Sequence, residues 1–298
     1  MRVAIVTFPG SNCDYDLYKC VQLVGGAPEF RWHRDVELGE VDVVMLPGGF
    51  SYGDYLRAGA IATMSPIMDA VKDFANVLRT TPTYAIWDDH DYGPNDSDGT
   101  AEGKENSLRA FRELWALPPT GTKDTPGAFY SFQWGDVEFF MLDGRYHRSP
   151  DKAENDDKKR MLGDAQFEWL LDGLRNSTAT FKVLASGSTL QASSGDGWRI
   201  YDFSRNRLYN AVNDNGIDGV IYLSGDVHSS SIQVHEAPGY PLVEVISSGI
   251  ANSGTKSFAT LSFDTSADDP TVRVRIIHGD GSVPKDEVFA LSAMTTSQ

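Results

Sequence analysis

Cysteine is scarce in this chain, which contains only Cys13 and Cys20 among its 298 residues. Small secreted domains that rely on disulfides carry several spaced cysteines, so the sequence excludes that class of protein. With so few thiols, a reducing compartment is the expected environment. The fold must therefore rest on a buried apolar core, and the length allows one large domain or two moderate ones.

Basic residues are also outnumbered, because 26 lysines and arginines face 42 aspartates and glutamates, for a net charge of −16 at pH 7. Such an excess disfavours binding to nucleic-acid backbones or to anionic membranes. Long hydrophobic runs are missing as well, and the apolar stretch that begins the chain is too short for a signal-peptide core or a membrane span. We therefore expect a cytoplasmic protein with no nucleic-acid or membrane partner; its oligomeric state stays open.

The first part of the chain alternates strand and helix patterns. Residues 2–8 form an apolar run typical of a buried strand, and residues 15–24 follow with helical spacing. A second buried strand is predicted at residues 42–46, and Ser65 is a suitable N-cap for a following helix. This order predicts an open α/β sheet of the flavodoxin-like kind.

The second part of the chain predicts a mixed α/β sandwich. Gly135 and Asp136 separate two strand-like runs, at residues 129–134 and 137–142, and indicate a hairpin. Amphipathic helices are predicted at residues 164–174 and 205–215. Further strands are predicted at residues 181–185, 219–223, 241–246, 259–263 and 271–277.

A cluster of acids around a histidine follows the strand-like run at residues 83–87. In an α/β sheet, ligands collect beyond the carboxyl ends of strands, which is where residues 88–91 would lie. Carboxylate oxygen together with imidazole nitrogen suits a transition metal or zinc better than calcium alone. Taken by itself, this cluster is explained as well by a solvated acidic turn.

A second cluster favours a metal site over a solvated acidic turn. Another strand-like run ends at Leu223, and Asp226 and His228 follow it. Residues two positions apart on an extended chain point to the same side, as two ligands of one ion do. Two strands that each lead into an acid and a histidine indicate a metal centre.

Two early motifs carry a resemblance to a known family. Residues 8–14, Phe-Pro-Gly-Ser-Asn-Cys-Asp, and residues 46–62, which begin Leu-Pro-Gly-Gly-Phe-Ser-Tyr, closely resemble the glutaminase subunit of phosphoribosylformylglycinamidine synthase, a class I glutamine amidotransferase. We assign residues 1–76 to this amidotransferase-like segment. The family places a nucleophilic cysteine after the next strand, where this chain has Trp87, so the glutaminase reaction lacks its nucleophile.

The rest of the chain, residues 77–298, resembles a different family. Its motifs Trp-Asp-Asp-His-Asp at residues 87–91, Leu-Asp-Gly-Arg at 142–145 and Ser-Gly-Asp-Val-His at 224–228 are similar to those of the alkaline phosphatase D-like branch of the calcineurin-like metallophosphoesterases. The resemblance implies a phosphatase or phosphodiesterase that acts on small-molecule phosphoesters. It also implies divalent or trivalent metal ions as cofactors: iron, calcium, manganese or zinc.

The same resemblance implies roles for individual side chains. Asp89, Asp226 and His228 would bind metal, and His90 would contact the phosphoryl oxygen or protonate the leaving group. Arg145 would hold the phosphate with two parallel hydrogen bonds, to which a guanidinium is suited. A surface ion pair with a nearby acid is the alternative interpretation of this arginine.

One feature of the phosphatase family is missing. The strand that ends in its metal-bridging aspartate belongs to the stretch that the amidotransferase-like segment occupies, although Asp54 lies in a similar Gly-Asp context and is a candidate replacement. A two-metal mechanism needs both ions, so weak activity is expected without this carboxylate. Two alternatives stay open: a catalytically silent chimera, and a glutaminase subunit without its nucleophile.

Overall fold

The computed structural model describes residues 2–11, 13–46, 65–68, 82–190, 195–237, 239–250 and 254–296. The chain divides into two compact units, Met1–Thr83 and Tyr84–Gln298, and each is described here by itself. The division lies slightly beyond residue 76, where the sequence motifs place the end of the amidotransferase-like segment.

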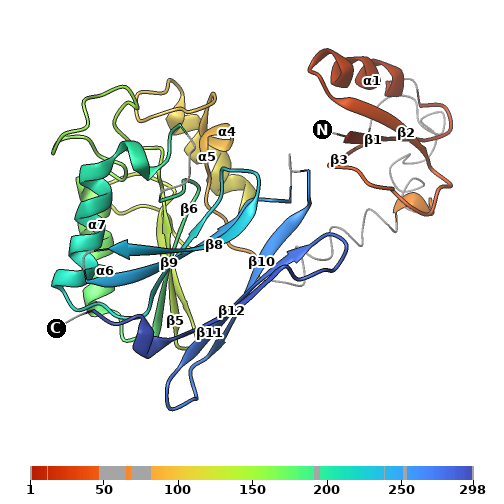
Figure 1. The fold of residues 1–298 in the computed structure, drawn as a ribbon. Helices are drawn as coiled ribbons and strands as arrows, with labels where there is room; N and C mark the ends of the chain where they lie inside the picture. The colour runs from red at the N-terminus through yellow and green to blue at the C-terminus, as the bar shows by residue number, and fades with distance from the viewer. Residues whose placement is uncertain are drawn as a thin grey trace. The chain divides into compact units, whose positions relative to one another are not determined.

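The first unit is built around a parallel sheet of three strands in the order β2-β1-β3 (Figure 1). The central strand β1 is buried on both faces, since Val3 and Ile5 pack with Val21 of the helix whereas Val6 packs with Ile67. A central parallel strand needs this continuous apolar run. The elements of this unit are β1 (Arg2–Thr7), α1 (Asp14–Leu23), β2 (Ala27–Trp32) and β3 (Val43–Met45).

The strand order agrees with the beginning of a flavodoxin-like sheet and confirms the open α/β arrangement predicted for this segment. The predicted helix after Ser65 lies mostly outside the described residues, which include only 65–68 of it. Asp54, the candidate replacement ligand, also lies outside the described residues.

The second unit contains a six-stranded sheet in the order β4-β5-β6-β7-β9-β8. The strands β5, β6, β7 and β9 run parallel, and β4 and β8 pair antiparallel at the two edges. The carboxyl ends of the four parallel strands therefore meet at one edge of the sheet. The strands are β4 (Tyr130–Trp134), β5 (Val137–Leu142), β6 (Phe181–Ser186), β7 (Val220–Ser224), β8 (Ser230–Ala237) and β9 (Tyr240–Ser247).

Both faces of this sheet are covered (Figure 1). The helices α6 (Asp164–Asn176) and α7 (Asp202–Asp214) pack on one face, and their apolar sides join the core through Leu170 and Leu208. A three-stranded antiparallel sheet covers the other face and adds Val272 and Val274 to the same core. Its strands are β10 (Ser257–Asp264), β11 (Thr271–His278) and β12 (Lys285–Ala290). The predicted α/β sandwich is confirmed.

Short helical elements complete the unit: α4 (Asp89–Tyr92), α5 (Lys104–Leu114), η2 (Trp198–Ile200) and η3 (Leu291–Ala293). The strand predicted at residues 83–87 is wrong, because residues 82–88 belong to no helix or strand. Side chains hold this segment instead: the Tyr84 ring stacks on Phe132 with centroids 3.6 Å apart, and the Tyr130 hydroxyl donates to the Ala85 carbonyl at 2.8 Å. The aromatic residues that suggested a strand serve these contacts.

Candidate metal centre

The loops that follow β6 and β7 are joined at the carboxyl edge of the parallel strands. The Gly225 amide donates to the Gly187 carbonyl at 2.9 Å, which ties the two loops together. A Cβ atom at Gly187 would lie 2.5 Å from the Asp88 carboxyl carbon, so only glycine allows Asp88 to approach the end of β6. This edge therefore brings the segment before α4 against two strand ends.

Three carboxylates gather at this edge. Asp89, Asp96 and Asp196 each offer an oxygen atom, and these atoms lie within 4.8 Å of one another. Within the described part of the chain, no other group of three or more metal-ligating side chains comes this close. Oxygen atoms at this spacing suit a hard divalent cation such as calcium, magnesium or manganese. The donor set therefore fits one metal ion.

Backbone donors prepare Asp89 for this role. Its carboxylate accepts hydrogen bonds from the amides of His90 at 2.7 Å and of Asp96 at 2.9 Å. Burial acts to raise the pKa of Asp89, but these amides and the charge of Arg145 outweigh burial and hold the pKa below its usual value. Burial and the negative charges of Asp196 and Asp89 raise the pKa of Asp96 instead. A bound cation would relieve that repulsion.

Arg145 is completely buried between two acids and is not a surface residue. Its Nη2 atom lies 2.6 Å from an oxygen of Asp88 and 2.6 Å from an oxygen of Asp196, and its Nε donates to Asp88 at 2.7 Å. Arg148 adds a second contact to Asp196 at 3.3 Å. The guanidinium thus orders two carboxylates of the edge, which favours a positioning role, and direct contact with phosphate stays a prediction.

The pKa of Asp88 is strongly shifted from its usual value. Burial raises the pKa of its carboxyl to about 6; the Arg145 charge opposes this effect, and the neighbouring Asp89 and Asp226 add to it. One unit of pKa corresponds to about 1.4 kcal/mol of differential interaction between the two protonation states. Burial therefore disfavours the charged form of Asp88 even with Arg145 in place, and the neighbouring acids add a smaller effect of the same sign.

Asp226 and His228 follow β7, but not in the expected extended conformation. Their φ angles are +70° and +53°, so the extended conformation on which the same-side expectation depended is not present. Together with Asp96, at +56°, they are the non-glycine residues with positive φ in the described chain, and all three lie at this edge. Such conformations cost about 1–3 kcal/mol each and cluster at functional sites.

The structure does not bring the four described metal and acid–base candidates to one point. Asp226 is close enough for its charge to act on Asp88, whereas His228 is exposed and its amide donates to Ser248 Oγ at 3.1 Å. His90 is exposed on the first turn of α4, beside Asp89. A shared ion for Asp89, Asp226 and His228, and a catalytic His90, stay predictions.

Sequence reasoning missed the residues that complete the cluster. Asp96 lies five residues beyond the Trp-Asp-Asp-His-Asp motif and was given no role, and no pattern links Asp196 to Asp89 across more than a hundred positions. Trp87, at the amidotransferase nucleophile position, is a core residue here: its ring packs against Tyr92 at 5.1 Å and its indole N–H donates to Asp143 at 2.8 Å. The tryptophan therefore serves the second unit.

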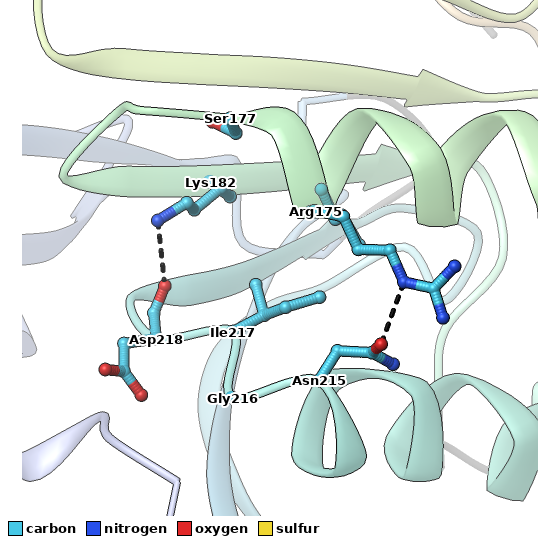
Figure 2. Close-up of a pocket in the computed structure, with 8 residues that line it drawn as sticks. Arg175, Ser177, Lys182, Asn215, Gly216, Ile217 and Asp218 are labelled. Carbon is cyan, nitrogen blue, oxygen red and sulfur yellow. Dashed lines mark hydrogen bonds between the residues drawn. The ribbon is translucent and has the colours of Figure 1, made fainter.

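A cavity of about 320 Å³ lies near the amino ends of β6 and β7, away from the carboxylate edge. Figure 2 shows that its two cations point apart: Lys182 donates to the Asp218 carbonyl at 3.3 Å, and Arg175 donates to Asn215 at 2.8 Å. Because the two charges do not converge, this cavity offers no counterpart to the carboxylate edge.

Comparison with known proteins separates the same two parts of the chain. The CobB/CobQ-like glutamine amidotransferase domain matches residues 1–86. Phosphoribosylformylglycinamidine synthase subunit PurQ of Methanopyrus kandleri is 53% identical over 75 residues, which are 25% of this chain and 33% of that protein. PurQ of Thermus thermophilus is 57% identical over 79 residues, 26% of this chain and 35% of that protein. The chain thus spans about a third of the length of these relatives.

The larger part of the chain matches a second family. The PhoD-like phosphatase family matches residues 68–278. A solved structure of PhoD superimposes with a TM-score of 0.51 at 20% identity, over 69% of this chain and 51% of that one, a level at which the likeness shows the fold. No helix in the described residues is long and apolar enough to cross a membrane. Both predicted resemblances are confirmed, and since the second covers well over half of the residues, the chain belongs to the PhoD-like phosphatase family.

Proposed function

We propose that the second unit hydrolyses phosphoesters with a metal ion held by Asp89, Asp96 and Asp196. The observation that carries this proposal is the approach of their three carboxylate oxygens to within 4.8 Å, at the edge where parallel strands end. Membership of the PhoD-like phosphatase family supports the reaction class, and the cluster supports its location. The metal would polarise the phosphoryl oxygen and activate the attacking water.

The surrounding side chains would orient the substrate and manage protons. His90 follows Asp89 and is exposed, so its imidazole is free to reach a phosphoryl oxygen or the leaving group. Asp226 and His228 approach from the end of β7 and are candidates for further ligands of an ion. Arg145 would keep Asp88 and Asp196 in place, because it contacts both.

A small phosphoester is the proposed substrate. With a net charge of −16, the chain would repel a long polyanion, whereas one phosphate group can be bound through a local cation. Both monoesters and diesters are compatible with this requirement. A chromogenic monoester and a chromogenic diester would therefore be assayed side by side, with manganese, calcium, iron and zinc added separately.

The test compares Asp89→Asn with the wild-type chain. Asp89→Asn should lose bound metal and hydrolysis together, because it removes one of three carboxylates. Asp286→Asn makes the same change of charge at an exposed site on β12 and should retain both properties. Wild-type protein that hydrolyses neither ester above the metal-only blank would refute the proposal.

A catalytically silent chimera is the second candidate. It is favoured by the partial match to the solved PhoD chain, of which 51% is covered. A silent chimera would give the refuting result just described while remaining folded. The amidotransferase candidate has less support, because Trp87 is buried and bonded to Asp143 within the second unit.

A further inference from the structure

A buried glutamate is hydrogen-bonded both to the end of β7 and to the loop that follows β6. Glu244 lies in the middle of β9, next to Tyr222 of β7 in the sheet, and its side chain is completely buried. Its Oε1 accepts hydrogen bonds from the Ser224 hydroxyl at 2.7 Å and from the Leu190 amide at 2.9 Å. One oxygen atom thus holds the end of β7 and the loop after β6.

His235 of β8 supplies the partner for the other oxygen of Glu244. The His235 Nε2 lies 2.6 Å from Oε2, and this imidazole is also buried. A carboxylate removed from water costs several kcal/mol unless it is paired, and an apolar pair of similar size is often as stable or more stable. Stability therefore gives little reason for an acid at this position, which directs attention to the groups it holds.

One of these groups lies close in the sequence to Asp226, and the other is connected to the segment of Asp196, an acid of the carboxylate cluster. Ser224 precedes Asp226 by one glycine. Thr189, beside Leu190, accepts a hydrogen bond from the Trp198 amide at 2.9 Å, and Trp198 follows Asp196 closely in the sequence. Glu244 is thus linked by hydrogen bonds to the segment that carries Asp226 and, through Leu190 and Thr189, to the segment that carries Asp196.

We propose that Glu244, paired with His235, is a positioning residue that holds Asp196 of the carboxylate cluster and the neighbouring Asp226 in place for metal binding. This inference rests on the proposed metal centre. Groups that orient metal ligands commonly change affinity by about 10- to 100-fold when they are removed. The same loss is expected here, although neither side chain belongs to the carboxylate cluster.

The double variant Glu244→Met/His235→Leu tests this role. It removes both polar groups and keeps side chains of similar length, so the melting temperature should change little, while the affinity of the full-length chain for Mn²⁺ falls by about 10- to 100-fold. Glu244→Gln keeps an oxygen that can accept from Ser224 and Leu190, and it should bind Mn²⁺ nearly as well as wild type. If the double variant does not fold, Ser224→Ala removes one tie alone and should give a smaller loss of the same sign.

Tyr240→Phe is the matched control. Its hydroxyl bonds the Val220 amide at 2.6 Å, so it too is a buried polar link between β9 and β7, at the opposite end of the strands. Tyr240→Phe should bind Mn²⁺ as wild type does. Unchanged affinity in the folded double variant, with wild type hydrolysing a phosphoester, would overturn the positioning role and leave the proposed function standing. Weakened Mn²⁺ binding in the double variant, together with a wild-type chain that hydrolyses neither ester, would support the positioning role and refute the proposed function.

Discussion

Removal of the Arg145 charge is expected to destabilise the second unit strongly at neutral pH. In Arg145→Met, Asp88 loses its ion pairs at 2.6 and 2.7 Å, and Asp196 keeps only Arg148 at 3.3 Å. Loss of one partner from a buried ion pair typically costs about 3–5 kcal/mol, because the remaining charge is left without compensation. With two acids affected and one partly compensated, we expect about 4 kcal/mol.

The loss should depend on pH in a defined direction. With Arg145 present, the pKa of Asp88 is about 6, and without the arginine it must rise further. At about pH 5, Asp88 is then largely protonated in both proteins, so the variant loses less stability there than at about pH 7.5. The variant should become progressively less stable, relative to wild type, as the pH rises through this window.

Urea unfolding would measure the loss, with the fluorescence of the buried Trp87 and Trp198 as the signal for the second unit. Asp88→Asn in the Arg145→Met background should recover part of the stability, because it removes the uncompensated charge. Arg273→Met breaks an exposed pair with Asp286 and should leave the stability nearly unchanged, because water screens exposed ion pairs. A loss below about 1 kcal/mol in Arg145→Met, or one that is equal at both pH values, would refute the assigned burial and pairing.

Three further predictions follow from the site. Between about pH 4 and 6, wild-type stability should fall by up to about 3 kcal/mol as pH rises, because folded Asp88 retains a proton that the unfolded chain has released; thermal melts of Asp88→Asn should lack this component. His90→Ala should keep its metal content and lose about 10²- to 10⁴-fold in turnover, so equal turnover would exclude an acid–base role. The chain should release no glutamate from glutamine, since Trp87 stands at the nucleophile position, and glutamate formation in an enzymatic assay would contradict this.

Much of the fold could be predicted because its strands are local, continuous apolar runs with turn signals between them. The predicted range 137–142 coincides with β5, and 219–223 differs from β7 by one position at each end. The edge strands β8 and β12 were not predicted, since their mixed burial leaves no continuous apolar pattern. The local sequence therefore predicts buried strands better than strands at the edge of a sheet.

The location of the site could be predicted from the sequence, but the full set of residues that form it could not. Asp89 and Asp226 were found because each follows a recognisable strand-like run. Asp196 was missed because its place depends on folding of the whole sheet, and the spacing of Asp226 and His228 misled because their backbone turns into the left-handed region. A two-residue periodicity holds only where the backbone remains extended.

The absence of ladder hydrogen bonds in residues 82–88 bears on how the chain can be rearranged. This segment reaches the sheet through the Tyr84 ring, the Ala85 carbonyl and the Trp87 indole. Among the residues that the structure describes upstream of Tyr84, none belongs to a strand of the six-stranded sheet. The boundary between the two units, at Thr83 and Tyr84, therefore falls outside the described strand pairs, so a sequence exchange at this position starts from a segment held by side chains and not by strand pairing.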